Sequence, residues 1–212
     1  QSINNQMLPE VTQGPINPSL PDMIIDTFGT TQVVEATPPA PSSGSSTVQF
    51  IDESEVMGGE RDMLVNLVSG NLEVELSVNE FGMSPVLDFE ASGGAIGNAT
   101  ITWDGIDGDA NAVPGLGLNG RDLTLGGQVA GIMMRLGVDA QGAEQSVEIK
   151  LFQGNTTTFS TASVLMPVTP TGTADEFLII PFTDFSGPVL PSNVDAIQLI
   201  LDSEDGASDS QF

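Results

Sequence analysis

The chain has 212 residues and 39% of them are hydrophobic, which is enough apolar side chain to build one sizeable domain. Four basic residues stand against 29 acidic ones, and the formal net charge of −25 makes nucleic acids and anionic lipid surfaces unfavourable partners. Cysteine, histidine and tyrosine are absent, which excludes disulfides and any Ser-His-Asp arrangement. Catalysis by two carboxylates stays open in principle, but nothing in the sequence pairs them, and we expect no enzyme.

The first 22 residues predict an extended N-terminal arm, because they are polar and contain four prolines. Pro9, Pro15 and Pro21 share one parity and only Pro18 breaks it, so the arm has the pattern of an edge strand; a free tail is the alternative. The chain begins at Gln1 without Met, which we interpret as a mature form or a cloning boundary. No apolar run is long enough to span a membrane.

Residues 23–212 predict a single domain, an all-β, jelly-roll-like antiparallel sandwich, because apolar and polar residues alternate in several short segments. In Leu72–Val78 the even positions are apolar and the odd positions polar, which is typical of a strand with one buried face. The segment 37–46, rich in proline, serine and glycine, predicts a loop. The predicted strands are Met23–Phe28, Gln32–Ala36, Val48–Ile51, Met63–Val68, Leu72–Val78, Val86–Glu90, Ala99–Trp103, Gly131–Val138, Ser146–Phe152, Thr158–Leu165, Glu176–Phe182 and Val194–Leu201.

The chain stops at Phe212, which resembles the start of a further strand that is not there. A sandwich that lacks a terminal strand leaves an open edge to which another chain can add a strand. Proteolytic processing is an equally good explanation of this end.

A polar loop follows the strand that ends at Trp103 and predicts a calcium site. Asp107, Asp109 and Asn111 alternate along the loop, so their oxygens can reach one side, and Asp104 can contribute from the strand end. Such Asx-rich loops also form ordinary turns without a metal, and the acidic charge as a whole can serve solubility alone. On the spacing of their oxygens, we predict Ca²⁺ as the cofactor, with Asp104, Asp107, Asp109 and Asn111 as its ligands.

The sequence also predicts a role for two further side chains, Trp103 and Arg61. Trp103 is the only tryptophan, and it can either stack on a sugar ring at the surface or pack into the core at the strand end. Arg61 lies between Glu60 and Asp62, which predicts a local ion pair that fixes the turn before the next strand.

Six short segments of the chain form a recognisable set, and in order they are Ile25–Phe28, Met57–Asp62, Ile101–Gly105, Gly115–Thr124, Pro181–Phe185 and Asn193–Leu199. Together they resemble a family of secreted bacterial β-sandwich surface proteins associated with PEP-CTERM-type sorting tails. The resemblance implies export and a β-sandwich fold for residues 23–212, and its overall pattern is similar to jelly-roll carbohydrate-binding modules. The final strand and the sorting tail usual in that family are not in this sequence, so the resemblance leaves anchoring open.

Two functions outside the cell follow as hypotheses. The first is a non-catalytic structural subunit of a surface filament, sheath or matrix, in which the arm adds a strand to the next copy and builds a homopolymer. The second is a carbohydrate-binding or adhesive module, dependent on calcium, with an extracellular polysaccharide as its partner. The residues expected to carry assembly are Val11, Ile16, Leu20, Ile24 and Phe212.

Overall fold

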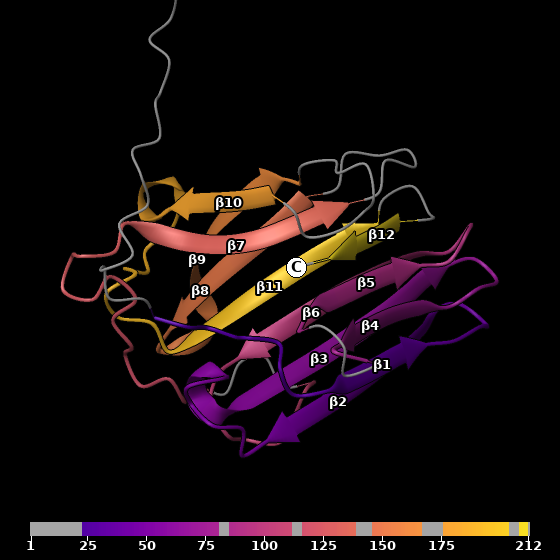
Figure 1. Cartoon of the computed structure of the whole chain (residues 1–212), viewed down its shortest axis with the longest axis horizontal. Coiled ribbons are helices and arrows are strands. Elements are labelled where there is room, and N and C mark those ends of the chain that lie inside the picture. The colour runs from indigo at the N-terminus through magenta and orange to yellow at the C-terminus, as the bar shows by residue number, and fades with distance from the viewer. Residues whose placement is uncertain are drawn as a thin grey trace, which may run out of the picture.

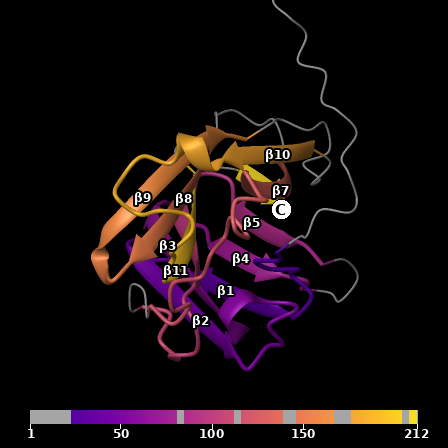
Figure 2. The same cartoon turned by 90° about the vertical axis from the view of Figure 1, so that its left-hand side faces the viewer.

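The protein is a sandwich of two antiparallel sheets in a computed structural model, which describes residues 23–80, 85–111, 116–138, 146–166, 176–203 and 208–211. Sheet 1 has the strand order β1-β4-β5-β12-β7-β10 and sheet 2 the order β2-β3-β6-β11-β8-β9. The two sheets lie face to face as two layers (Figure 1, Figure 2). The predicted all-β, jelly-roll-like antiparallel sandwich is confirmed.

Most of the strands lie at or near the predicted positions, and β2 and β12 are the exceptions. Sheet 1 contains β1 (Gln32–Ala36), β4 (Val74–Val78), β5 (Leu87–Ala91), β7 (Gly131–Val138), β10 (Glu176–Pro181) and β12 (Ser208–Gln211). Sheet 2 contains β2 (Ser42–Gln49), β3 (Glu60–Ser69), β6 (Ile96–Trp103), β8 (Ser146–Gln153), β9 (Asn155–Leu165) and β11 (Ala196–Ser203). Two short 3₁₀ turns, η1 (Met57–Gly59) and η2 (Phe182–Asp184), precede β3 and follow β10.

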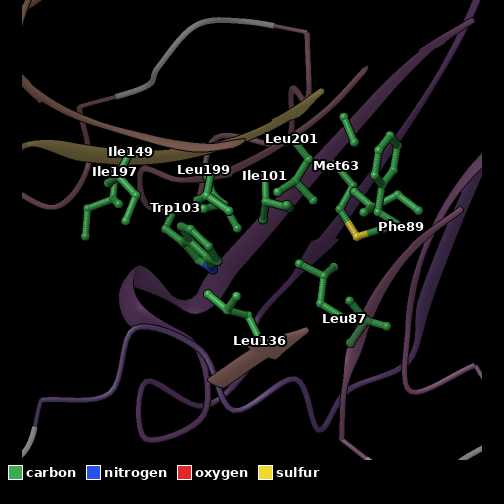
Figure 3. Packing of buried hydrophobic residues seen from close by; sticks show 14 of the residues in the cluster. Met63, Leu87, Phe89, Ile101, Trp103, Leu136, Ile149, Ile197, Leu199 and Leu201 are labelled. Carbon is green, nitrogen blue, oxygen red and sulfur yellow. The ribbon is translucent and has the colours of Figure 1, made fainter. Parts of the chain in front are cut away.

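The core lies between the sheets and is built by the alternating residues of each strand. Met63, Ile101 and Leu199 are direct neighbours on β3, β6 and β11, and all three are buried. They lie in the same cluster as Phe89 and Leu136 of sheet 1 (Figure 3). Each such side chain contributes about 1.5–3 kcal/mol when it is fully removed from water. Because these side chains of sheet 2 pack against sheet 1, the residues between them along each strand point outward.

Three predictions about secondary structure were wrong. The segment Met23–Phe28 forms no strand and makes only an isolated bridge between Asp26 and Val56. The second half of segment 37–46 is not a loop, since Ser42–Gln49 pairs with β3 along its whole length. The C-terminal residues Ser208–Gln211 already form a strand, which lies inside sheet 1 between β5 and β7 rather than beside an open edge.

Residues 1–22 and Phe212 lie outside the described residues, so the N-terminal arm and its separation from the sandwich domain stay predictions. Among the residues that the structure describes, no helix has the length and apolar character needed to cross a membrane.

Candidate functional site

The beginning of β3 and the end of β6 place charged residues on both faces of sheet 2. Successive residues of a strand point to opposite faces. Arg61 and Trp103 therefore point into the sandwich, while Glu60, Asp62 and Asp104 point outward. All five side chains are buried nevertheless, so each face of this corner holds a polar centre with little access to water.

The inner centre is a carboxylate whose two oxygens are fully hydrogen-bonded. Arg61 donates from Nε to Asp26 Oδ2 over 2.6 Å and from Nη2 to Asp26 Oδ1 over 2.8 Å. Trp103 Nε1 donates to Oδ2 over 2.8 Å, and the backbone N–H of Phe28 donates to Oδ1 over 2.7 Å. Arg61 Nη1 also donates to the carbonyl of Thr30 over 3.0 Å. This network fastens the segment before β1 to sheet 2.

This centre overturns the predicted pairing of Arg61 and decides between the two interpretations of Trp103. Arg61 pairs with Asp26, which is 35 residues away, and not with its neighbours Glu60 and Asp62, because those point to the other face. Trp103 is 4% exposed and uses its N–H inside the protein, so stacking on a ligand at the surface is wrong and core packing is confirmed.

The outer centre is a cluster of four acidic residues that can hold a metal ion. Glu60, Asp62, Asp104 and Asp107 each offer one carboxylate oxygen, and these four oxygens all lie within 4.8 Å of one another. The first three side chains are buried and Asp107 is exposed. Carboxylate oxygens at such spacing are the ligands that hard divalent cations prefer.

Glu60 connects the cluster to the loop that follows β6. Its Oε1 accepts the backbone N–H groups of Asp107 and Gly108, both over 3.0 Å. The approach of this loop depends on glycine: Gly58 has φ +80°, and a Cβ there would lie 3.0 Å from the backbone nitrogen of Gly105. At Gly105, φ is +86° and a Cβ would lie 2.8 Å from Gly117. The glycines of these segments therefore allow η1, the end of β6 and residue 117 to meet.

Asp62 is only partly hydrogen-bonded. Its Oδ1 accepts the hydroxyl of Thr47 over 2.6 Å, but its buried Oδ2 has no hydrogen-bond partner among the described residues. Burial is the main cause that raises the pKa of Asp62 to about 7; the charges of Glu60, Asp104 and Asp107 contribute to this rise, and the hydrogen bond from Thr47 opposes it. A buried carboxylate with a free oxygen is costly unless a cation or proton reaches it.

The predicted calcium ligands are divided by the structure. Asp104 and Asp107 belong to the acidic cluster. Asp109 and Asn111 do not, because they form ordinary turns: the N–H of Asp109 donates to Asp107 Oδ1 and the N–H of Asn111 donates to Asp109 Oδ1. Asn111 Nδ2 also donates to Ser45 Oγ over 3.3 Å, so this end of the loop lies against β2.

Glu60 and Asp62 were missed as candidates. A local search for alternating oxygen ligands cannot find them, because they precede the loop by more than 40 residues. The signal was nevertheless in the sequence, since two acids that flank one arginine at the start of a buried strand must share the face opposite to that arginine.

The outer face of sheet 2 carries a continuous row of polar residues across all six strands. Asp62 is the second member, and each residue pairs in register with the next. Gln198 Nε2 donates to Thr102 Oγ1 over 3.2 Å within the row. In strand order the row is Thr47, Asp62, Thr102, Gln198, Lys150 and Thr161.

At the β9 end this row is more open and includes an aromatic ring. Lys150 Nζ lies 3.6 Å from Glu148 Oε2 and 5.4 Å from the centre of the Phe159 ring. Thr161 Oγ1 donates to Glu148 Oε1 over 2.7 Å, and Phe159 is 37% exposed. Hydroxyl, carboxylate, ammonium and aromatic groups thus meet at one exposed place.

Of the residues predicted to carry assembly, only Ile24 is described, and its side chain is 46% exposed. Val11, Ile16, Leu20 and Phe212 lie outside the described residues.

No family model matches the chain, and no curated protein matches it. Among solved structures the chain is similar to a family 11 carbohydrate-binding module of a cellulosomal cellulase of Clostridium thermocellum, at 11% identity and a TM-score of 0.33, over 86% of this chain and 91% of that one. The same module in complex with a β-1,3-1,4-mixed-linked tetrasaccharide gives 11% identity and a TM-score of 0.33, over 85% and 93%. The enzymatically active domain of a tailspike protein of bacteriophage CBA120 gives 11% and 0.30, over 88% of this chain and 19% of that one. The fold described above depends on the strand pairing of this chain and not on these likenesses.

Proposed function

We propose that this chain is a non-catalytic extracellular binding module that holds a polysaccharide on the outer face of sheet 2, with Ca²⁺ as its cofactor. The observation that carries the proposal is the polar row across the six strands of that sheet, which ends beside the exposed ring of Phe159. Sugar hydroxyls both donate and accept hydrogen bonds, and the C–H face of a sugar packs on an aromatic ring.

The charge of the chain narrows the class of polysaccharide. With a formal net charge of −25, the protein repels polymers that carry carboxylate or sulfate groups. Lys150 is the basic residue of the polar row, and it already interacts with Glu148. A neutral polysaccharide is therefore the ligand that this face favours.

The burial of the acidic cluster supports a binding role over hydrolysis. Glycosidases need two carboxyl groups that open on the substrate on either side of the bond to be cleaved. Glu60, Asp62 and Asp104 are 0%, 2% and 1% exposed, so a glycosidic bond has no access to them.

Affinity electrophoresis through gels that contain neutral polysaccharides tests the proposal. The double substitution Lys150→Met with Phe159→Ala should weaken retardation by at least about tenfold, because it removes both the ammonium donor and the ring. The matched control is Glu75→Gln on β4, which points outward from sheet 1 between Val74 and Leu76 and should bind as the wild type does. If no neutral polysaccharide retards the wild type in the presence of calcium, or if the double variant binds equally well, the proposal fails.

The filament function stays a prediction, and we propose it only as a second candidate. It rests on residues 1–22, which lie outside the described residues. Deleting these residues and finding the same oligomer by light scattering as for the full chain would exclude strand addition through the arm.

A further inference from the structure

We propose that Glu60, Asp62, Asp104 and Asp107 together hold one calcium ion, which fastens the loop after β6 to the outer face of sheet 2. The proposed function includes Ca²⁺ as a cofactor without assigning its ligands, and these four residues are the ligands that we assign. It uses only contacts of these side chains, so it stands whether or not the module binds a polysaccharide.

The spacing of the four oxygens fits a calcium ion. Calcium–oxygen distances are about 2.3–2.6 Å, so two ligands on opposite sides of one ion lie about 4.6–5.2 Å apart. The four carboxylate oxygens all lie within 4.8 Å of one another, so one calcium ion can contact them together. Magnesium needs oxygens at about 2.0–2.1 Å in a nearly ideal octahedron, so fewer arrangements of carboxylate oxygens can bind it than can bind calcium.

The second observation is the buried Oδ2 of Asp62, which points to a ligand independently of the cluster. Asp62 is 2% exposed, and within the described part of the chain this oxygen has no hydrogen-bond partner. Buried polar atoms in proteins are nearly always paired, and an unpaired one signals a bound water or ion, or a functional role. A cation in the cluster supplies the missing partner.

The three ion pairs between described residues all lie outside the cluster. Arg61 is bonded to Asp26 on the opposite face, Arg121 to Glu53, and Lys150 to Glu148. Arg135, on β7 of sheet 1, lies over the ring of Phe177. Three buried carboxylates beside one another repel strongly, and a divalent cation offsets this repulsion more effectively than a proton on one of them.

The contacts of Glu60 explain what the ion does for the structure. Glu60 accepts two N–H groups of the loop, and Asp107 brings a carboxylate from the same loop into the cluster. An ion bound here joins the start of β3, the end of β6 and the loop in a single coordination sphere. The loop is then held from both sides, with Asn111 against Ser45 at its far end.

Equilibrium dialysis of the full-length chain with calcium, at about physiological salt to suppress weak surface binding, tests the proposal. The wild type should bind one tightly held calcium per chain, and its thermal midpoint should rise on adding calcium more than on adding magnesium. Asp62→Asn keeps the size of the side chain and the bond from Thr47 but removes the charge, and it should weaken calcium binding by at least about tenfold. Asp104→Asn should do the same.

The matched control is Asp109→Asn, which removes an identical charge from the same loop. Asp109 makes a turn and lies outside the cluster, so this variant should bind calcium as the wild type does. The proposal is overturned if the wild type binds no tightly held calcium. It is also overturned if Asp62→Asn and Asp104→Asn, both folded by circular dichroism, bind calcium as tightly as Asp109→Asn.

Discussion

Two buried acidic centres lie on opposite faces of sheet 2, and they differ in how the buried carboxylate is compensated. On the inner face, Asp26 accepts four hydrogen bonds and is paired with Arg61. On the outer face, Asp62 accepts one bond from Thr47 and is surrounded by three more carboxylates. Adjacent residues of β3 supply both centres.

The comparison separates a structural carboxylate from one that is set up for a ligand. A buried ion pair with every oxygen satisfied holds segments together, and it needs nothing from outside the protein. A buried carboxylate with a free oxygen and like charges around it is destabilising on its own. Four substitutions test this difference between the centres of Asp26 and Asp62, and their expected effects decrease in the order below.

Replacing Arg61 should cost the most. Arg61→Met leaves the carboxylate of Asp26 buried without its cation, and breaking such a pair typically costs about 3–5 kcal/mol of unfolding free energy. Urea denaturation followed by tryptophan fluorescence measures the loss. The control is Arg121→Met, whose partner Glu53 is exposed, and it should change stability by less than about 1 kcal/mol. Equal effects of the two changes would mean that the inner centre is no structural anchor.

Replacing Asp62 should stabilise the calcium-free protein, and the effect should depend on pH. Burial raises the pKa of Asp62 from 3.8 to about 7, so between these values the folded chain binds a proton that the unfolded chain has released. Stability from this group is therefore complete below about pH 4, falls as the pH rises towards 7, and changes no further above it. Asp62→Asn should remove this slope.

The gain in unfolding free energy from Asp62→Asn should reach at most about 4 kcal/mol at pH 8. The measurement is urea denaturation of both proteins in chelator, from pH 4 to 8. If the unfolding free energies of the two proteins change in parallel with pH, the pKa of Asp62 is not raised in the folded protein.

Replacing Trp103 with Phe tests the third donor of the inner centre. The change removes the N–H that Asp26 Oδ2 accepts over 2.8 Å and keeps an aromatic ring in the core. Hydrogen bonds to charged groups contribute about 1.5–3 kcal/mol, and a loss of that size is expected on thermal unfolding followed by circular dichroism. A loss below about 0.5 kcal/mol would mean that Arg61 and the backbone N–H of Phe28 satisfy the carboxylate without the indole.

Replacing Thr47 with Val should give the smallest change. The substitution removes the hydroxyl that donates to Asp62 Oδ1, which should cost about 1 kcal/mol at pH 8. It should also raise the pKa of Asp62 further, because that hydrogen bond favours the charged carboxylate. The fall of stability with pH should then shift to higher pH, and an unchanged midpoint would contradict this role of Thr47.

The sandwich could be predicted from the sequence where apolar residues alternate, and not where a strand depends on its neighbours. Gln32–Ala36 and Gly131–Val138 were predicted to the residue. Ser42–Gln49 is rich in serine and resembles a linker, yet it is a strand because β3 offers it a full ladder of backbone partners. Ser208–Gln211 is polar, and its place depends on β5 and β7.

The candidate site could be predicted only in part, for a similar reason. Asp104 and Asp107 are close in sequence, so the loop pattern found them. Glu60 and Asp62 join them through the register that places Asp62 beside Thr102, and such a contact between distant segments is invisible to a local pattern. The pairing of Asp26 with Arg61 and Trp103 was missed for the same reason.

The position of β12 has a consequence for the order in which sheet 1 is completed during folding. β12 alone connects β5 to β7 in the strand order of sheet 1, which otherwise consists of the ribbon β1-β4-β5 and the ribbon β7-β10. The two ribbons therefore join into one sheet only when residues 208–211 pair with both of them. Until then the facing edges of β5 and β7 stay unpaired, and such edges can pair with another chain.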